Sequence, residues 1–170
     1  TITITVNPLP VVTTTTTASS ICIGGNSIIL ASGASTYNWM PGNLNGASVI
    51  VSPISTTTYT VTGTSAAGCV NTATITITVN PFPVVTATSS SATVCAGTSV
   101  TLTGGGAATY TWDNNVMDAV SFVPTATTTY MVTGTDANGC VNTASTTVTV
   151  NPLPIVTATS SSASVCTGGS

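Results

Sequence analysis

The sequence predicts an all-β protein made of β-sandwich domains in tandem. In segments such as residues 72–79, Thr alternates with Ala, Ile or Val, which is the two-residue period of a half-buried strand. A long repeat is also present, because the motif Asn-Pro-Leu/Phe-Pro begins at Asn7, Asn80 and Asn151, with periods of 73 and 71 residues (80 − 7, 151 − 80). Each repeat has one tryptophan, Trp39 or Trp112, as a small sandwich with one aromatic centre requires.

The repeat divides the chain into four parts. Residues 1–6 match residues 74–79 and are expected to be the last strand of a preceding repeat. Residues 7–79 and 80–150 are expected to be two whole units, and residues 151–170 the start of a third. The prolines between units fix φ and restrict the residue before them, so short, stiff joints are expected. We therefore expect the chain to be a piece of a longer array.

Strand-like runs alternate with turn residues along each unit. The turns are predicted from clusters of Gly, Pro, Asn and Asp, such as residues 24–26, 41–43 and 136–139. Strands are expected in the second unit at residues 84–88, 99–104, 109–113, 119–123, 128–135 and 141–150, and the first unit is expected to contain the same set.

One connection differs in length between the units. The tryptophan and the following tyrosine are 20 residues apart in the first unit (59 − 39) and 18 in the second (130 − 112). This difference predicts a variable surface loop between them, where a ligand site would most readily change.

The expected core follows from the size of the units. A domain of roughly 70 residues buries only about 60% of the surface of its unfolded chain, so it needs large core residues and further support. We expect Trp39 and Trp112 at the two centres, packed against Tyr59 and Tyr130. Disulfides are expected to supply the support.

Five cysteines are present: Cys22 and Cys69 in the first unit, Cys95 and Cys140 in the second, and Cys166 where a third begins. They predict disulfides from an oxidising compartment rather than zinc ligands, because there is no Cys-x-x-Cys pair and no His. The favoured pairing lies within units, Cys22 with Cys69 and Cys95 with Cys140. The alternative joins Cys22 to Cys140 across the joint, because the two turns of one sandwich can lie at opposite ends, roughly 20 Å apart.

The composition excludes most polar chemistry. The chain has no Lys, Arg or His, and its only acids are Asp113, Asp118 and Asp136. General acid/base catalysis and nucleophile activation need a titratable base, and nucleic-acid binding needs cations to neutralise phosphates. We therefore expect no enzyme activity, no cofactor and no nucleic-acid partner.

Three motifs have a plain structural interpretation beside a functional one. The segment 136–139, Asp-Ala-Asn-Gly, has one carboxylate and is predicted to be a hairpin turn rather than a calcium loop. Trp112-Asp113 is predicted to be a core tryptophan at a strand end rather than a sugar-stacking platform. The threonine rows at 13–17 and 56–58 are predicted to be wet strand faces rather than glycan- or ice-binding arrays.

The repeated motifs resemble those of a known family. The motifs are Val-Cys-x-Gly-x-Ser-Val-Thr-Leu-Thr at 94–103, Thr-Tyr-Thr-Trp at 109–112, Thr-Thr-Thr-Tyr-x-Val-Thr-Gly-Thr-Asp-Ala-Asn-Gly-Cys at 127–140 and Thr-Val-Thr-Val-Asn-Pro-Leu-Pro at 147–154. They resemble the immunoglobulin-like (Ig-like) and PKD-like repeats of large Bacteroidota surface proteins, and among these most of all the repeats of gliding adhesins. The Trp-Asp-Phe-Gly-Asp-Gly loop of PKD domains is absent, because Trp112-Asp113 continues as Asn114-Asn115.

The resemblance implies tandem Ig-like or PKD-like sandwiches, export by the type IX route and display outside the cell. The expected function is that of a structural segment in a cell-surface adhesin filament that supports attachment and gliding. The alternatives are a carbohydrate- or surface-binding module and a passive spacer in a secreted hydrolase. The expected partners are neighbouring repeats, an external surface or glycan and, through other parts of the parent protein, the envelope secretion and motility machinery.

Overall fold

A computed structural model of the chain describes residues 1–159, Ser164 and Thr167, and its described residues form strands without any helix. The strands of the first unit are β1 (Thr13–Thr16), β2 (Ser20–Cys22), β3 (Ser27–Ser32), β4 (Thr36–Met40), β5 (Leu44–Asn45), β6 (Ser48–Val51), β7 (Thr57–Thr64) and β8 (Val70–Asn80). Those of the second are β9 (Thr86–Ser89), β10 (Thr93–Cys95), β11 (Val100–Gly105), β12 (Thr109–Trp112), β13 (Ser121–Phe122), β14 (Thr128–Thr135) and β15 (Val141–Asn151). The predicted all-β sandwich class is confirmed.

Each unit consists of two sheets. In the first unit the strand orders are β1-β3-β6 and β2-β8-β7-β4-β5, and in the second they are β13-β11-β9 and β10-β15-β14-β12. The short strands β2 and β10 run parallel to β8 and β15, whereas the other pairings are antiparallel. The start of each unit therefore contributes one strand to each sheet, β1 and β2 or β9 and β10.

The alternating sequence produces the core. Along β7, Tyr59, Val61 and Gly63 are buried, while the intervening threonines are at least partly exposed. Outward threonines of neighbouring strands pair through their hydroxyls, as in Thr58 with Thr76 at 2.8 Å. The threonines of β7 thus line its wetter face, and Tyr59 and Val61 line its dry face.

All four aromatic residues expected at the centres are buried. Trp39 is fully buried, and Tyr59, Trp112 and Tyr130 are between 5% and 6% exposed. Burial raises the pKa of Tyr59 above its ordinary value, because removal from water disfavours the phenolate. In the second unit, the ring of Phe122 meets that of Tyr130 edge to face, with ring centroids 5.3 Å apart.

The units differ where the sequence lengths differ. Between its tryptophan and tyrosine the first unit has two strands, β5 and β6, whereas the second has only β13. The expectation of identical strand sets is therefore wrong at this connection. Two short strands, β2 and β10, were also not predicted, because three residues are too few to show a period.

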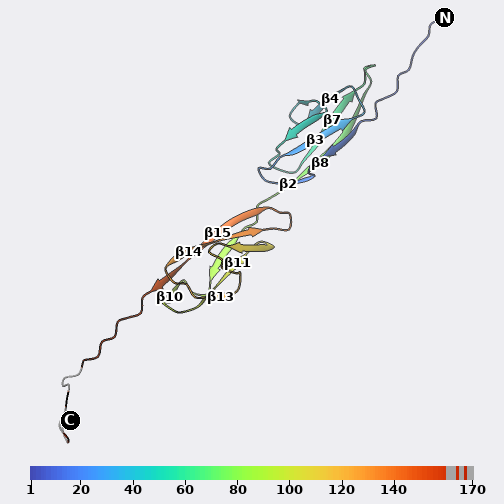
Figure 1. Cartoon of the computed structure of the whole chain (residues 1–170). Coiled ribbons are helices and arrows are strands. Elements are labelled where there is room, and N and C mark those ends of the chain that lie inside the picture. Colours follow the sequence, from blue (N-terminus) through green and yellow to red (C-terminus); the bar gives the residue numbers. More distant parts are fainter. Residues whose placement is uncertain (160–163, 165–166, 168–170) are drawn as a thin grey trace.

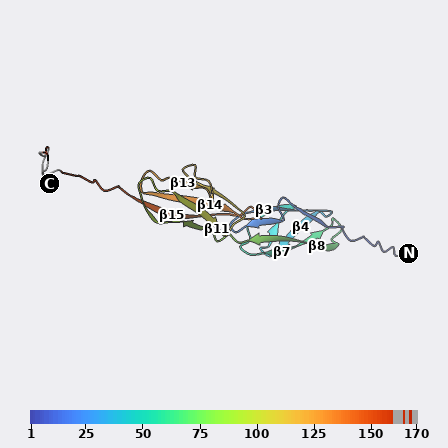
Figure 2. The same cartoon turned by 90° about the horizontal axis from the view of Figure 1, so that it is seen from below.

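Figure 1 shows the two units one after the other, with the chain termini at opposite ends. The view turned by 90° in Figure 2 has the same in-line arrangement, so the elongation does not depend on viewpoint. Residues 1–6 are exposed and have no strand structure, although their pattern predicted a strand. The segment between β8 and β9 forms the joint between the two units.

Candidate functional site: the joint between the units

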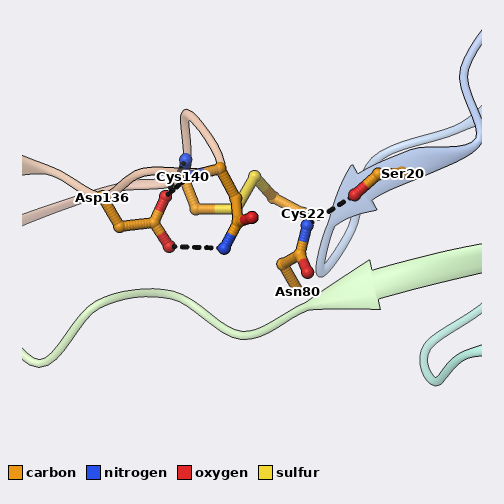
Figure 3. The surroundings of a disulfide bond; sticks show 6 residues. Ser20, Cys22, Asn80, Asp136 and Cys140 are labelled. Atoms are coloured by element: carbon orange, nitrogen blue, oxygen red, sulfur yellow. Dashed lines mark hydrogen bonds between the residues drawn. A yellow bond between two sulfur atoms is a disulfide. The ribbon is translucent and has the colours of Figure 1, made fainter.

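A disulfide bond crosses the joint. Cys22 of the first unit is bonded to Cys140 of the second, with the two Cα atoms 5.6 Å apart and a sequence separation of 118. This Cα separation is ordinary for a disulfide. Figure 3 shows the bond beside Asn80, the last residue of β8. In the chain-entropy model, closing a loop of 118 residues contributes about 5 kcal/mol.

The favoured pairing of Cys22 with Cys69 and of Cys95 with Cys140 is therefore corrected. Cys22 lies opposite Asn80, at the end of β8, whereas Cys69 directly precedes Val70, where β8 begins. A strand of 11 residues is roughly 35 Å long, far beyond the reach of a disulfide. The structure has the alternative pairing, Cys22 with Cys140, because the two cysteine-containing turns of one unit lie at opposite ends of that unit.

Cys22 is placed by the parallel pairing of β2 with β8. The amide of Ile23 donates to the carbonyl of Asn80 at 3.0 Å, and the Asn80 side-chain amide donates to the hydroxyl of Ser20 at 2.7 Å. The amide of Gly25 donates back to the Cys22 carbonyl at 2.9 Å, which closes a turn after the cysteine. These bonds fix Cys22 at the end of the first unit that faces the joint (Figure 3).

Cys140 is placed by the turn between β14 and β15. One carboxylate oxygen of Asp136 accepts the amides of Asn138 and Cys140, each at 2.8 Å. The amide of Asp136 donates to the Cys140 carbonyl at 3.0 Å, and Cys140 is fully buried. Asp136 therefore organises a hairpin turn, as predicted for this segment. No group of three or more potential metal ligands occurs in the part of the chain that the structure describes.

The linker itself is docked onto the second unit. The Asn142 side-chain amide donates to the carbonyl of the buried Pro83 at 2.9 Å. A Cβ at Gly106, where φ is +84°, would collide with the Val84 carbonyl oxygen, and one at Gly134 would stand 2.6 Å from a Val85 methyl group. Glycine is therefore required at both positions for the linker to approach so closely.

The first unit holds its own entering segment in the same way. The Asn71 side-chain amide donates to the carbonyl of the buried Pro10 at 2.9 Å. Gly33, with φ +94°, faces the Val11 carbonyl oxygen, and a Cβ at Gly63 would stand 2.6 Å from a Val12 methyl group. The docking of a linker on the unit that follows it is thus a property of the repeat.

The remaining carboxylates are structural. Asp118 accepts the indole N–H of Trp112 and the amide of Gly104, both at 2.8 Å, and Asp113 accepts the amide of Met131 at 3.1 Å. In the first unit the indole of Trp39 donates instead to the Gly46 carbonyl at 3.1 Å. Sequence reasoning gave Asp118 no role, because its contact depends on the path of the variable loop. Trp112, being buried, has no free face for stacking a sugar.

Two cysteines are free among the described residues: Cys69, which is partly buried, and Cys95, which is exposed. Cys166 lies outside the described residues. Shallow depressions also occur, one of about 270 Å³ lined in part by Phe122 and Tyr130, and one of about 380 Å³ beside Tyr37. They occupy different places in the two units, so they do not belong to the repeated design.

No family model matches the chain, and no curated protein matches it. Among solved structures, a bacterial ice-binding adhesin described in relation to host cell surface retention is similar, with 17% identity and a TM-score of 0.50, over 85% of this chain and 66% of that one. Murine CEACAM1b has 12% identity and a TM-score of 0.41, over 84% of this chain and all of that one. A mouse coronavirus receptor-binding domain in complex with its murine receptor gives 14% identity and a TM-score of 0.42, over 82% of this chain and all of the matched chain.

At these identities only the fold is shown, and the likeness to the bacterial adhesin carries it. With a parallel pairing, β2–β8 in the first unit and β10–β15 in the second, and with two facing sheets, each unit is an Ig-like β-sandwich. No helix within the described residues is long and apolar enough to cross a membrane.

Proposed function

We propose that this chain is a structural segment of an extracellular adhesive filament attached to a cell surface. Its Ig-like units are held in line, and they project a binding region that lies elsewhere in the parent protein. The observation that carries the proposal is the Cys22–Cys140 bond, because a covalent link between two units resists their separation under load.

Three further observations support this proposal. Each unit docks the segment that enters it in the same way, through Asn71 in the first unit and Asn142 in the second. Disulfides persist in oxidising compartments, which favours a location outside the cytoplasm. A bacterial adhesin is among the solved structures with this fold, and the low identity leaves that as support only.

In its finer form, the proposal is that the filament takes part in gliding motility and leaves the cell by the type IX route. Its partners are then neighbouring repeats and, through other parts of the parent protein, the envelope secretion and motility machinery. This finer form rests on the repeat motifs, above all the segment 127–140 with its terminal cysteine.

The test is to attach beads, coated with an antibody raised against this chain, to living cells that produce the parent protein. Beads that bind and travel along the cell support both the filament and its role in gliding. Beads that bind and stay still support a static adhesin and remove the motility part. If beads do not bind intact cells while the antibody detects the protein in the medium, the surface filament is wrong and a spacer in a secreted protein is correct. Beads with antibody pre-adsorbed on the purified chain are the matched control.

A carbohydrate- or surface-binding module is the second candidate, and the depression beside Phe122 and Tyr130 in the variable loop favours it. It predicts saturable binding of the purified chain to glycans or glass, and that binding would weaken in a Thr125→Ala variant, because Thr125 is exposed and lines this depression. A chain that binds neither surface leaves the segment with its structural role alone.

A further inference from the structure

The joint has two open counterparts within the same chain. In the repeat, Cys95 occupies the position equivalent to Cys22, and Cys69 occupies the position equivalent to Cys140. Cys22 and Cys140 are bonded to each other, whereas Cys69 and Cys95 are free thiols in the structure. The internal repeat therefore shows the same two cysteines once joined and once apart.

The surroundings of Cys95 reproduce those of Cys22. Cys95 ends β10 and lies opposite Asn151, just as Cys22 ends β2 and lies opposite Asn80. The amide after each cysteine donates to that asparagine carbonyl, at 2.9 Å from Ala96 and at 3.0 Å from Ile23. The turn that follows is closed in both cases, and its glycines have φ values of +86° and +82°. Cys95 is exposed at the far end of the second unit, with no Cys140 counterpart beside it.

The surroundings of Cys69 reproduce those of Cys140. The amide of Cys69 donates to the Ser65 hydroxyl at 3.1 Å, in the place that the Asp136 carboxylate takes for Cys140. The amide of Ser65 donates to the Cys69 carbonyl at 2.9 Å, and the preceding glycine has φ +80° in both turns. The Cys69 thiol donates to the carbonyl of Asn7 at 3.6 Å. Asn7 is the counterpart of Asn80, beside which the formed bond lies.

We propose that Cys69 and Cys95 each form an inter-unit disulfide of the Cys22–Cys140 type with a further copy of this unit. Cys69 accepts the Cys22-type cysteine of a unit that precedes it, and Cys95 accepts the Cys140-type cysteine of a unit that follows. This inference rests on the proposed function, in which the two units belong to a longer series of units in one filament. In each step two thiols lose two protons and two electrons and form one S–S bond, and a disulfide donor is reduced to two thiols.

Such a series has overlapping covalent loops. The formed loop runs from Cys22 to Cys140, and the next begins at Cys95, so the 45 residues from Cys95 to Cys140 (140 − 95) lie within two loops. A single broken bond therefore leaves that stretch enclosed by the neighbouring bond. Pairing within units would give separate loops, and the main chain would then be the one covalent link between neighbouring units.

The test is a three-unit chain in which residues 80–150 are repeated once after Val150, with Cys166→Ser so that every cysteine belongs to a complete unit. It is folded with oxidised glutathione as the disulfide donor. The expected product has two bonds, Cys22–Cys140 and Cys95 to the Cys140 of the added copy, and two free thiols. Zero free thiols would show pairing within units and overturn the proposal, and four would show that only the first bond forms and also overturn it.

Cyanogen bromide, which cleaves after methionine, identifies the bonds. Under non-reducing conditions, the fragment 1–40 should remain joined to the one that contains the original Cys140. The fragment 41–117 should remain joined to the one that contains the added Cys140. Pairing within units would hold all four cysteine-containing fragments together. In a Cys95→Ser variant, the second pair of fragments should separate while the first remains joined.

These outcomes are independent of the proposed function. A three-unit chain with four free thiols, or with none, overturns the ladder even if antibody-coated beads bind to cells, and failure of the beads to bind leaves the bond map unchanged. The mirrored chain, in which residues 7–79 are repeated before Asn7, tests Cys69 in the same way.

Discussion

The bond across the joint should determine how far the chain extends under force. When the chain is pulled from Thr1 and Ser170, the load passes through the Cys22–Cys140 bond and bypasses everything between the two cysteines. The strands β3 to β14 all lie inside that loop, so neither unit can lengthen fully. The perturbation is Cys22→Ser, which opens the loop and leaves the rest of the chain intact.

The magnitude follows from the enclosed length. An extended chain spans about 3.3–3.6 Å per residue, so the 118 residues of the loop correspond to roughly 400 Å. The bond itself holds the ends 5.6 Å apart, which is negligible beside that length. A fully unfolded Cys22→Ser chain should therefore be roughly 400 Å longer than the oxidised parent.

The assay is single-molecule force spectroscopy with handles attached by peptide ligation, so that no cysteine is used for attachment. Cys95→Ser is the matched control, because Cys95 is free in the structure and its replacement should leave the contour length unchanged. Pairing within units predicts the opposite. Cys95→Ser would then release the 45 residues up to Cys140 (140 − 95), roughly 150 Å, and Cys22→Ser only the 47 up to Cys69 (69 − 22), roughly 160 Å. Either of these shorter gains would refute the cross-joint bond.

Three further predictions concern stability, measured by urea unfolding with tryptophan fluorescence. Gly106→Ala should reduce the free energy of unfolding by roughly 3 kcal/mol or more, and Gly97→Ala by only about 1–2 kcal/mol. Both glycines have positive φ, but only Gly106 faces the linker. Equal losses would contradict the docking of the linker. Asp118→Ala should lose about 2–3 kcal/mol by leaving the Trp112 indole N–H without its acceptor, whereas Asp118→Asn, which keeps an oxygen, should lose less. Burial raises the pKa of Tyr59, so its contribution to stability is complete below pH 10 and is lost as the pH rises through that raised pKa. Tyr59→Phe should therefore reduce the loss of stability at alkaline pH. An unchanged dependence of stability on pH would contradict this prediction.

Much of the fold could be predicted from the sequence because strand alternation is a local property. The strand β14 was predicted at its observed bounds, and β15 within one residue, since long runs of alternating Thr and apolar residues leave little ambiguity. The strands β2 and β10 were missed, because their existence depends on pairing with a distant strand rather than on their own residues. The two-residue strand β13 was predicted too long for a similar reason.

The site could be predicted less well, because it depends on those missed strands. The pairing of β2 with β8 places Cys22 at the end of β8 remote from Cys69, and without that pairing the sequence leaves both disulfide patterns open. The role of Asp118 was equally invisible, since a two-residue deletion changes which group meets the tryptophan indole. Both features are decided by chain topology, which a one-dimensional pattern does not contain.

The composition also explains why the joint takes the form it does. With no Lys, Arg or His, the chain can form no ion pair between side chains of neighbouring units. The joint is crossed by a disulfide, and the linker is docked on the second unit by an amide-to-carbonyl hydrogen bond; both are independent of a net charge of either sign. Screening by salt weakens charge pairs but acts little on such contacts. The geometry of the joint should therefore change little with salt concentration or with mild changes in pH.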